Sequence, residues 1–261
     1  MSDQARIQEA YQHLLRAEAE HQAITPLTEL YPDLTVDEAY QVQLLTISQR
    51  VKDGQPIIGK KIGLTSVPMQ QMFGVDQPDY GHLLSSMQIQ NKGIIRADRL
   101  FQPKVEAEIA FVLKKDLHGP NVTLEDVLHA TDYVVAALEI VDSRIKDWKI
   151  KLQDTIADNA SSGLFVLGDE RFSAADIDLT KEEMKLYRNG EYVNTGSGSA
   201  VLGHPATCAA WLANKLYEYN VNLKAGEVIL SGALSAAVNA YQGDRVTAEF
   251  INLGKVEVAF T

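Results

Sequence analysis

Residues 1–55 place apolar side chains at helical spacing. Within the first twenty residues they follow the i, i+3, i+4 pattern at Ile7, Ala10, Tyr11, Leu14 and Leu15. This spacing predicts an amphipathic helix. Thr35 and Glu38 form a T-x-x-E capping box ahead of a second stripe at Tyr40, Leu44, Ile47 and Val51. We therefore expect residues 1–55 to form a helical segment packed on the rest of the chain.

From residue 56 the pattern changes to short β-branched runs interrupted by Gly and Pro. Strands and loops are predicted over 56–64, 75–83 and 93–97. Residues 105–113 alternate strictly, with apolar residues on one face and Glu106 and Glu108 on the other. This alternation predicts a strand.

The second half of the chain contains both kinds of element. The continuous apolar run 133–141 predicts a buried strand. Thr123 and Asp126 form a second capping box before a short helix, and His204-Pro205 is typical of the start of another helix. Further strands are predicted at 227–230, 245–251 and 256–260. We expect one structural domain, in which residues 56–261 form a β-rich core.

Composition and charge exclude several classes of protein. The chain has 261 residues, of which 35 are Asp or Glu and 24 are Lys or Arg, and its basic residues form no stripe that could bind phosphates. Its longest apolar run is far shorter than the ~20 residues of a membrane span. The single Cys208 excludes an intrachain disulfide, and the N-terminus lacks an apolar signal region. We expect a cytoplasmic protein with neither nucleic acid nor membrane as partner.

Three carboxylates are the candidate functional groups. Glu106 and Glu108 point the same way from one strand, about 7 Å apart, and their face continues with Ala110 and Val112. Glu139 lies alone in an apolar run, where an unpaired charge is costly. A hard divalent cation would compensate all three, and oxygen ligands without His or Cys favour Mg²⁺ or Mn²⁺ over zinc.

Simpler explanations stay open for these carboxylates. An E-x-E strand commonly faces solvent with Lys or Arg opposite, and Glu139 could form a buried ion pair with Lys61 or Arg144. The Gly-rich run 196–203 lacks dinucleotide spacing and no predicted strand precedes it, so we expect a loop. His82 follows Asp79 in a predicted loop and is expected at the surface, whereas Cys208 is expected in the core.

Five segments carry a resemblance to a known family. They are 59–66, 77–81, 103–110, 138–144 and 158–162. Together they resemble the hydratase and decarboxylase branch of the fumarylacetoacetate hydrolase superfamily over nearly the whole chain. The resemblance implies an α+β fold, a mixed β-roll (fumarylacetoacetase C-terminal-like) core with N-terminal helices. It also implies a homo-oligomer, decameric or pentameric, and a Mg²⁺ or Mn²⁺ held by Glu106, Glu108 and Glu139.

The same resemblance implies a reaction and the residues that perform it. It implies water addition to 2-hydroxypenta-2,4-dienoate (2-oxopent-4-enoate), giving 4-hydroxy-2-oxopentanoate in aromatic meta-cleavage catabolism. Lys61 and Asp79 would stand at the catalytic centre. The substrate carboxylate would contact Ser231 together with Ser161 or Ser162.

Other activities are compatible with the same scaffold. One is 4-oxalocrotonate decarboxylation, against which Asp79 argues because the branch's decarboxylases tend to carry an apolar residue there. A second is hydration of 2-oxohept-4-ene-1,7-dioate. Its hydratases have a longer insertion after the segment that corresponds to 142–144, whereas residues 144–154 of this chain form a short segment. A third is a non-catalytic protein with ion-paired carboxylates. The resemblance also implies a complex with 4-oxalocrotonate decarboxylase as a functional partner.

Overall fold

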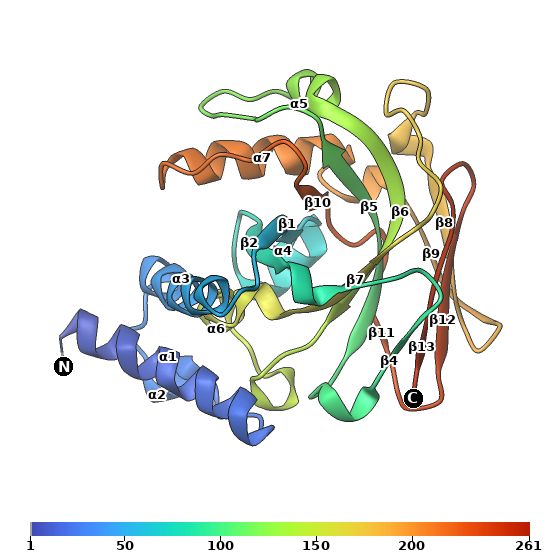
Figure 1. Ribbon diagram of the computed structural model, residues 1–261. Helices are drawn as coiled ribbons and strands as arrows, with labels where there is room; N and C mark the ends of the chain where they lie inside the picture. The colour runs from blue at the N-terminus through green and yellow to red at the C-terminus, as the bar shows by residue number, and fades with distance from the viewer. Residues whose placement is uncertain (1) are drawn as a thin grey trace.

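Helices form the N-terminal part of the computed structural model, which describes residues 2–261 (Figure 1). Their bounds are Asp3–Glu20 for α1, Leu27–Leu30 for α2 and Val36–Lys52 for α3. Both predicted helices are confirmed, and the capping box of Thr35 and Glu38 begins α3 as predicted. The one-turn helix α2 was not predicted.

The buried face of α3 differs from the predicted stripe. Tyr40 and Ile47 are buried, but Leu44 is 41% and Val51 43% exposed. Helix α3 packs against both α1 and α6 (Leu152–Ala157). Its buried face therefore includes Ala39, Val42 and Gln43, and Leu44 and Val51 lie outside that face.

The larger sheet curls around the interior of the molecule (Figure 1). Within the described residues its strands follow the order β2, β1, β10, β5, β6, β7 and β3, with β11 beside β5. Their bounds are Asp79–Leu84, Ile57–Gly63, Val228–Leu230, Lys104–Leu113, Thr131–Val141, Ser162–Leu167, Gln88–Ile89 and Val238–Asn239, respectively. The pairing of β5 with β6 is antiparallel and places Glu106 opposite Glu139.

A smaller sheet packs against β6 and β7. Its order is β4, β13, β12, β8 and β9, with bounds Gly93–Ile95, Gly254–Phe260, Arg245–Phe250, Glu183–Arg188 and Glu191–Ser197. The expectation that no strand precedes 196–203 was wrong, because β9 ends at Ser197. Asn189 and Gly190 both have positive φ and form the tight turn between β8 and β9, so this Asn-Gly pair was an available hairpin signal.

Of the remaining α-helices, α5 and α7 pack on each other and contact β6 and β1 of the larger sheet, respectively. Their bounds are Val67–Phe73 for α4, Leu124–Ala130 for α5 and Pro205–Tyr217 for α7. The predicted cap at Thr123 and the helix start at His204 are confirmed. Cys208 is buried on α7 as predicted. Helices α4 and α6 were not predicted.

The two faces of β5 enter different packed regions. Val105, Ala107 and Ile109 join the main core, which both sheets and the helices share. The opposite face joins a smaller apolar group that includes Ala110 and Val112. The predicted strand alternation is therefore confirmed, as is the α+β fold with curled, mixed sheets and N-terminal helices.

His82 does not lie in a surface loop. It belongs to β2 and is 4% exposed. It is buried because β2 pairs along its length with β1 and because the His82 ring contacts Gln43 of α3. Asp79 is the first residue of β2 and is also buried. Among the helices of residues 2–261, none combines the length and the apolarity needed to cross a bilayer.

Candidate metal and catalytic centre

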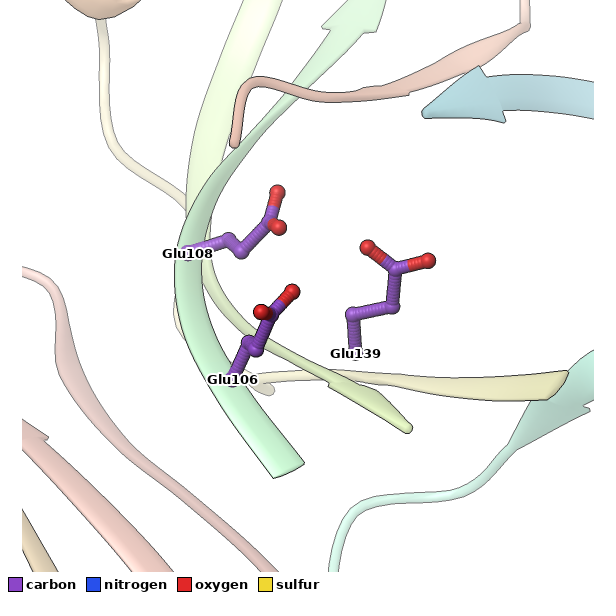
Figure 2. Close-up of side chains that lie close together, drawn as sticks. All are labelled: Glu106, Glu108 and Glu139. Carbon is purple, nitrogen blue, oxygen red and sulfur yellow. The ribbon is translucent and has the colours of Figure 1, made fainter. Parts of the chain in front are cut away.

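Glu106, Glu108 and Glu139 converge on the concave side of the larger sheet. Figure 2 shows the two β5 carboxylates pointing toward that of Glu139 on β6. One carboxylate oxygen of each residue lies within 4.8 Å of those of the other two. The register of β5 and β6 produces this arrangement, since residues directly opposite in an antiparallel pair share a face.

The carboxylates have few hydrogen-bond partners. Glu108 Oε2 accepts from the Gly232 N–H at 2.7 Å, whereas its Oε1 and both oxygens of Glu139 are buried without a hydrogen bond in the described structure. Lys61 Nζ lies 3.2 Å from Glu139 Oε1 and donates to the Ala160 carbonyl at 3.0 Å. The predicted ion-pair alternative with Lys61 is thus present. Lys61 supplies one positive charge to a group of three carboxylates.

Arg144, the other predicted counter-charge for Glu139, is used elsewhere. Its guanidinium pairs with Asp158 and donates to the Ser162 carbonyl at 3.1 Å. Glu139 therefore receives no contribution from this arginine.

Burial and mutual repulsion make the three carboxylates hard to ionise together. Burial, followed by the charge of Glu139, raises the pKa of Glu106 to about 7 and that of Glu108 well above its usual value. Burial also raises the pKa of Glu139, although Lys61 opposes it. Burial tends to lower the pKa of Lys61, but the charges of Glu139 and Asp79 outweigh it. A divalent cation fits here because it would neutralise the repulsion and occupy the unpartnered oxygens.

Asp79 lies beside Lys61 on the same face of the sheet. The pairing of β1 and β2 places Gly63 opposite Asp79 and Lys61 opposite Gly81. A Cβ atom on Gly63 would lie only 2.2 Å from Asp79 Oδ1, so the absence of a side chain at Gly63 makes room for the carboxylate. Burial raises the pKa of Asp79 while Lys61 lowers it, and the net direction is upward.

A cavity of about 680 Å³ joins these groups. Lys61, Asp79, Glu106 and Ser161 all line it. Much of the remaining wall is apolar and comes from α4 and the segment after β6, including Met69, Met72, Phe73, Trp148 and Ile150. Such a cavity, mostly apolar with a few convergent charged groups, is typical of a small-molecule site.

The three predicted serines have different environments. Ser161 lines the cavity, and its Oγ lies 3.2 Å from Thr155 Oγ1. Ser162 donates its hydroxyl to the Asn159 carbonyl at 2.7 Å, and Ser231 donates to the Ile109 carbonyl at 2.8 Å. The structure thus brings Ser161 together with Lys61 and Asp79, while Ser162 and Ser231 lie outside the cavity lining.

Lys104 and Trp148 were not identified from the sequence. Both line the cavity, and Lys104 Nζ lies 4.3 Å from the centre of the Trp148 ring. Strand alternation could have found Lys104, because it is two residues before Glu106 and so shares its face. Trp148 has positive φ in an irregular segment after β6, and no local pattern places it near the site.

Comparisons with known proteins extend over most or all of the chain. A family model described as fumarylacetoacetate (FAA) hydrolase C-terminal matches residues 70–261. The chain is 48% identical to a 2-hydroxyhexa-2,4-dienoate hydratase of Comamonas testosteroni, with 100% of both chains covered. It is 46% identical to a 2-keto-4-pentenoate hydratase of Paraburkholderia xenovorans, with 100% of this chain and 96% of the relative covered.

A solved structure is also similar over its full length. It is 4-oxalocrotonate decarboxylase from Pseudomonas putida G7, complexed with magnesium and adipate. The TM-score is 0.96 and the identity 36%, with 100% of this chain and 99% of that chain covered. The likeness therefore includes the N-terminal helices as well as the region that the family model matches.

Proposed function

The chain belongs to the fumarylacetoacetate hydrolase family, and from this premise we propose that it is a hydro-lyase acting on 2-hydroxypenta-2,4-dienoate. Water addition to this compound, the enol form of 2-keto-4-pentenoate, yields 4-hydroxy-2-oxopentanoate in aromatic meta-cleavage catabolism. Relatives named as hydratases match the chain over its full length and support the activity. The observation that carries the proposal is that Asp79 and Lys61 line the same cavity as Glu106, one of the three convergent carboxylates.

We propose Glu106, Glu108 and Glu139 as ligands of Mg²⁺ or Mn²⁺. The unpartnered oxygens of Glu108 and Glu139 support this assignment, as do the raised pKa values of all three residues. The magnesium in the structure of the 4-oxalocrotonate decarboxylase supports it as well. When bound, the cation would supply Lewis acidity that stabilises negative charge on the C2 oxygen of the substrate.

The protein's own groups would handle charge and protons around the substrate. Lys61 is assigned to stabilise the anionic substrate or to deliver the proton that C5 receives, which converts the dienol into an electrophilic enone. Asp79 is assigned to activate the water that adds at C4, since a carboxylate within the cavity can accept its proton. The Ser161 hydroxyl is assigned to the substrate carboxylate, because the hydroxyls of Ser162 and Ser231 already donate to backbone carbonyls.

Decarboxylation of 4-oxalocrotonate is the second candidate function. The 0.96 TM-score to a decarboxylase favours it. The same lysine would then stabilise the enolate that remains after loss of CO₂. Asp79 favours hydration over decarboxylation, because only hydration needs a group that activates water beside C4.

One assay separates the two functions. 2-Hydroxypenta-2,4-dienoate, generated enzymatically, should lose its ultraviolet absorbance when the protein and Mg²⁺ or Mn²⁺ are added. Exhaustive chelation should stop the reaction, and either cation should restore it. 4-Oxalocrotonate tested in parallel should release CO₂ more slowly than the dienoate is hydrated. Faster CO₂ release would favour the decarboxylase, and activity that survives chelation would contradict the metal assignment.

We also propose a cytoplasmic homo-oligomer, decameric or pentameric, that associates with a 4-oxalocrotonate decarboxylase. Apolar side chains exposed on different elements support self-association, among them Met72, Ile94, Tyr192, Tyr241 and Ile251. Sedimentation velocity of the purified protein, alone and mixed with the decarboxylase, tests the assembly. A monomer at micromolar concentration would contradict it.

A further inference from the structure

Gln43 is a fully buried amide on α3 that contacts two separate elements of the core. Its Nε2 donates to the Tyr80 carbonyl of β2 at 3.1 Å and to the Ile156 carbonyl of α6 at 2.8 Å. Its Oε1 lies 3.0 Å from His82 Nδ1. Both amide hydrogens and the amide oxygen are therefore satisfied, as expected for a buried side chain that determines one arrangement of its neighbours.

The carbonyls of Tyr80 and Ile156 determine the orientation of this amide, and His82 completes its hydrogen bonds. Burial, followed by the charge of Lys60, lowers the pKa of His82 to about 3, so the ring is neutral near pH 7. A neutral ring facing an amide oxygen carries its hydrogen on that nitrogen and donates it. A reversed Gln43 amide would place its oxygen against two carbonyls and its NH₂ group against the ring N–H. The two carbonyls can only accept hydrogen bonds, so they exclude the reversed arrangement.

The two elements that Gln43 joins lead directly into the candidate site. On one side, Asp79 precedes Tyr80 in β2. On the other side, α6 is followed by the short helix η4 (Asn159–Ser161), whose three residues have φ of 55, 50 and 53°. Three consecutive non-glycine residues in this region are strained and need support from their surroundings.

The helix η4 is also attached to β2 and to the catalytic lysine. Asn159 Oδ1 accepts from the His82 N–H at 2.8 Å, and its Nδ2 donates to the His82 carbonyl at 2.9 Å. The next carbonyl, that of Ala160, accepts from Lys61 Nζ, and Ser161 lines the cavity. The spacing between β2 and η4 thus sets where Asp79 lies relative to Ser161 and to the Ala160 carbonyl that binds Lys61.

We propose that Gln43 is a positioning residue: by joining β2 to α6 through its amide, it holds Asp79 at its distance from Ser161 and from the Ala160 carbonyl that binds Lys61. Gln43 touches none of the reacting groups and lies outside the residues that the family model matches. The inference rests on the proposed hydratase function for its kinetic readout. The proposal gives α3 a part in positioning the catalytic groups. That part is separate from metal binding by the three carboxylates on β5 and β6.

The test substitutes Gln43→Met, which keeps an unbranched side chain but removes both donors, with Gln49→Met on the exposed face of the same helix as control. Gln43→Met should lower kcat by roughly 10- to 100-fold at saturating dienoate and metal, the scale of a small misplacement of reacting groups. Mn²⁺ affinity should stay within about twofold, because the three carboxylates are untouched. Amide hydrogen exchange should accelerate in 80–82 and 156–162. Gln49→Met should change none of these.

Two results would overturn the inference. One is a kcat of Gln43→Met within about twofold of wild type, measured below the melting temperature of the variant. This result would count against the proposal even if the variant is less stable than wild type. The other is unchanged exchange in 156–162. If Gln43→Met does not fold, the isosteric Gln43→Glu, which replaces both donors by an acceptor, is tested by the same criteria. A wild-type protein without hydratase activity would defeat the proposed function alone, and the exchange measurement would still decide the role of Gln43.

Discussion

The two carboxylate oxygens of Glu108 have different surroundings, one at the loop that contains Gly232 and one in the candidate metal site. One of its oxygens accepts from the Gly232 N–H. Gly232 has a φ of +109°, and a Cβ there would lie 2.2 Å from the Thr65 hydroxyl oxygen, so only glycine fits. The other oxygen of Glu108 has no hydrogen-bond partner and is free to ligate a cation.

Glu108→Gln should abolish metal-dependent turnover while the fold is kept, because the amide oxygen can still accept from Gly232 but the anionic ligand is lost. Without metal, the variant should melt at a higher temperature than wild type, since it no longer buries a carboxyl group whose pKa is raised by burial and by its neighbouring carboxylates. Mg²⁺ at 100 times its Kd should stabilise wild type by about 2.7 kcal/mol and the variant far less. Calorimetry with and without Mg²⁺ measures both effects. Wild-type turnover and metal content in the variant would remove Glu108 from the site.

Asp79→Asn should keep the metal and bind the substrate-like inhibitor oxalate, yet lose water addition by ~10²-fold or more, the scale of a lost general acid–base group. The amide has the size of the carboxylate and fits the same space above Gly63. Hydration rate and oxalate affinity are measured on one preparation. Equal loss of both would indicate that β2 is displaced, and loss of neither would exclude Asp79 from the mechanism.

At the scale of one element, β1 separates two buried lysines by strand alternation. Lys60 and Lys61 are adjacent and both buried, but they point to opposite faces. Lys60 Nζ contacts the two oxygens of Glu227 at 2.8 and 3.0 Å. Lys61 faces Glu139 and the cavity. Two adjacent lysines therefore lie in two different environments, one in a buried ion pair and one at the cavity.

The variants Lys60→Met and Lys61→Met should have contrasting effects. Lys60→Met leaves Glu227 buried without its cation and should lower the free energy of unfolding by roughly 3–5 kcal/mol, with the catalytic groups in place. Lys61→Met removes a charge from the cavity and should abolish hydration, while added Mg²⁺ compensates Glu139 and maintains the fold. Urea denaturation and hydration rates test the pair. Lys61→Met with normal kcat would contradict its assignment.

At the scale of the whole molecule, the curl of the larger sheet concentrates negative charge on its concave side. Glu106, Glu108 and Glu139 meet there with Asp79, in a chain whose formal net charge is −11. Lys61 and Lys104 compensate part of this charge from the cavity wall. Stability of the metal-free protein should therefore depend on whether these carboxylates are protonated.

Metal-free protein should lose stability as the pH rises. Glu106 has a folded pKa raised from 4.5 to about 7, so the folded state binds more protons than the unfolded state between these values. The stabilising contribution is complete below pH 4.5 and is lost as the pH rises through 7. Mg²⁺ should reverse the loss, because it replaces the protons. Melting temperatures from pH 5 to 8, in chelator and in Mg²⁺, test this, with Glu106→Gln as control. A chelated wild type as stable at pH 8 as at pH 5 would contradict it.

Structural features that depend on contacts between residues close in the chain were predictable from the sequence. The capping boxes at Thr35 and Thr123 begin helices as predicted, because a cap depends only on the side chain and the next three residues. The alternation of β5 placed Glu106 and Glu108 on one face for the same reason. The burial of Glu139 followed from the apolar run around it.

Tertiary structure alone decided which distant groups meet. The register of β5 against β6 sets Glu106 opposite Glu139, and the pairing of Arg144 with Asp158 leaves Lys61 as the cation beside Glu139. His82 became a buried hydrogen-bond donor because α3 packs over β2 and places Gln43 against its ring. Each of these outcomes depends on pairing and packing between segments far apart in the chain, and such contacts leave no periodic signal in the local sequence.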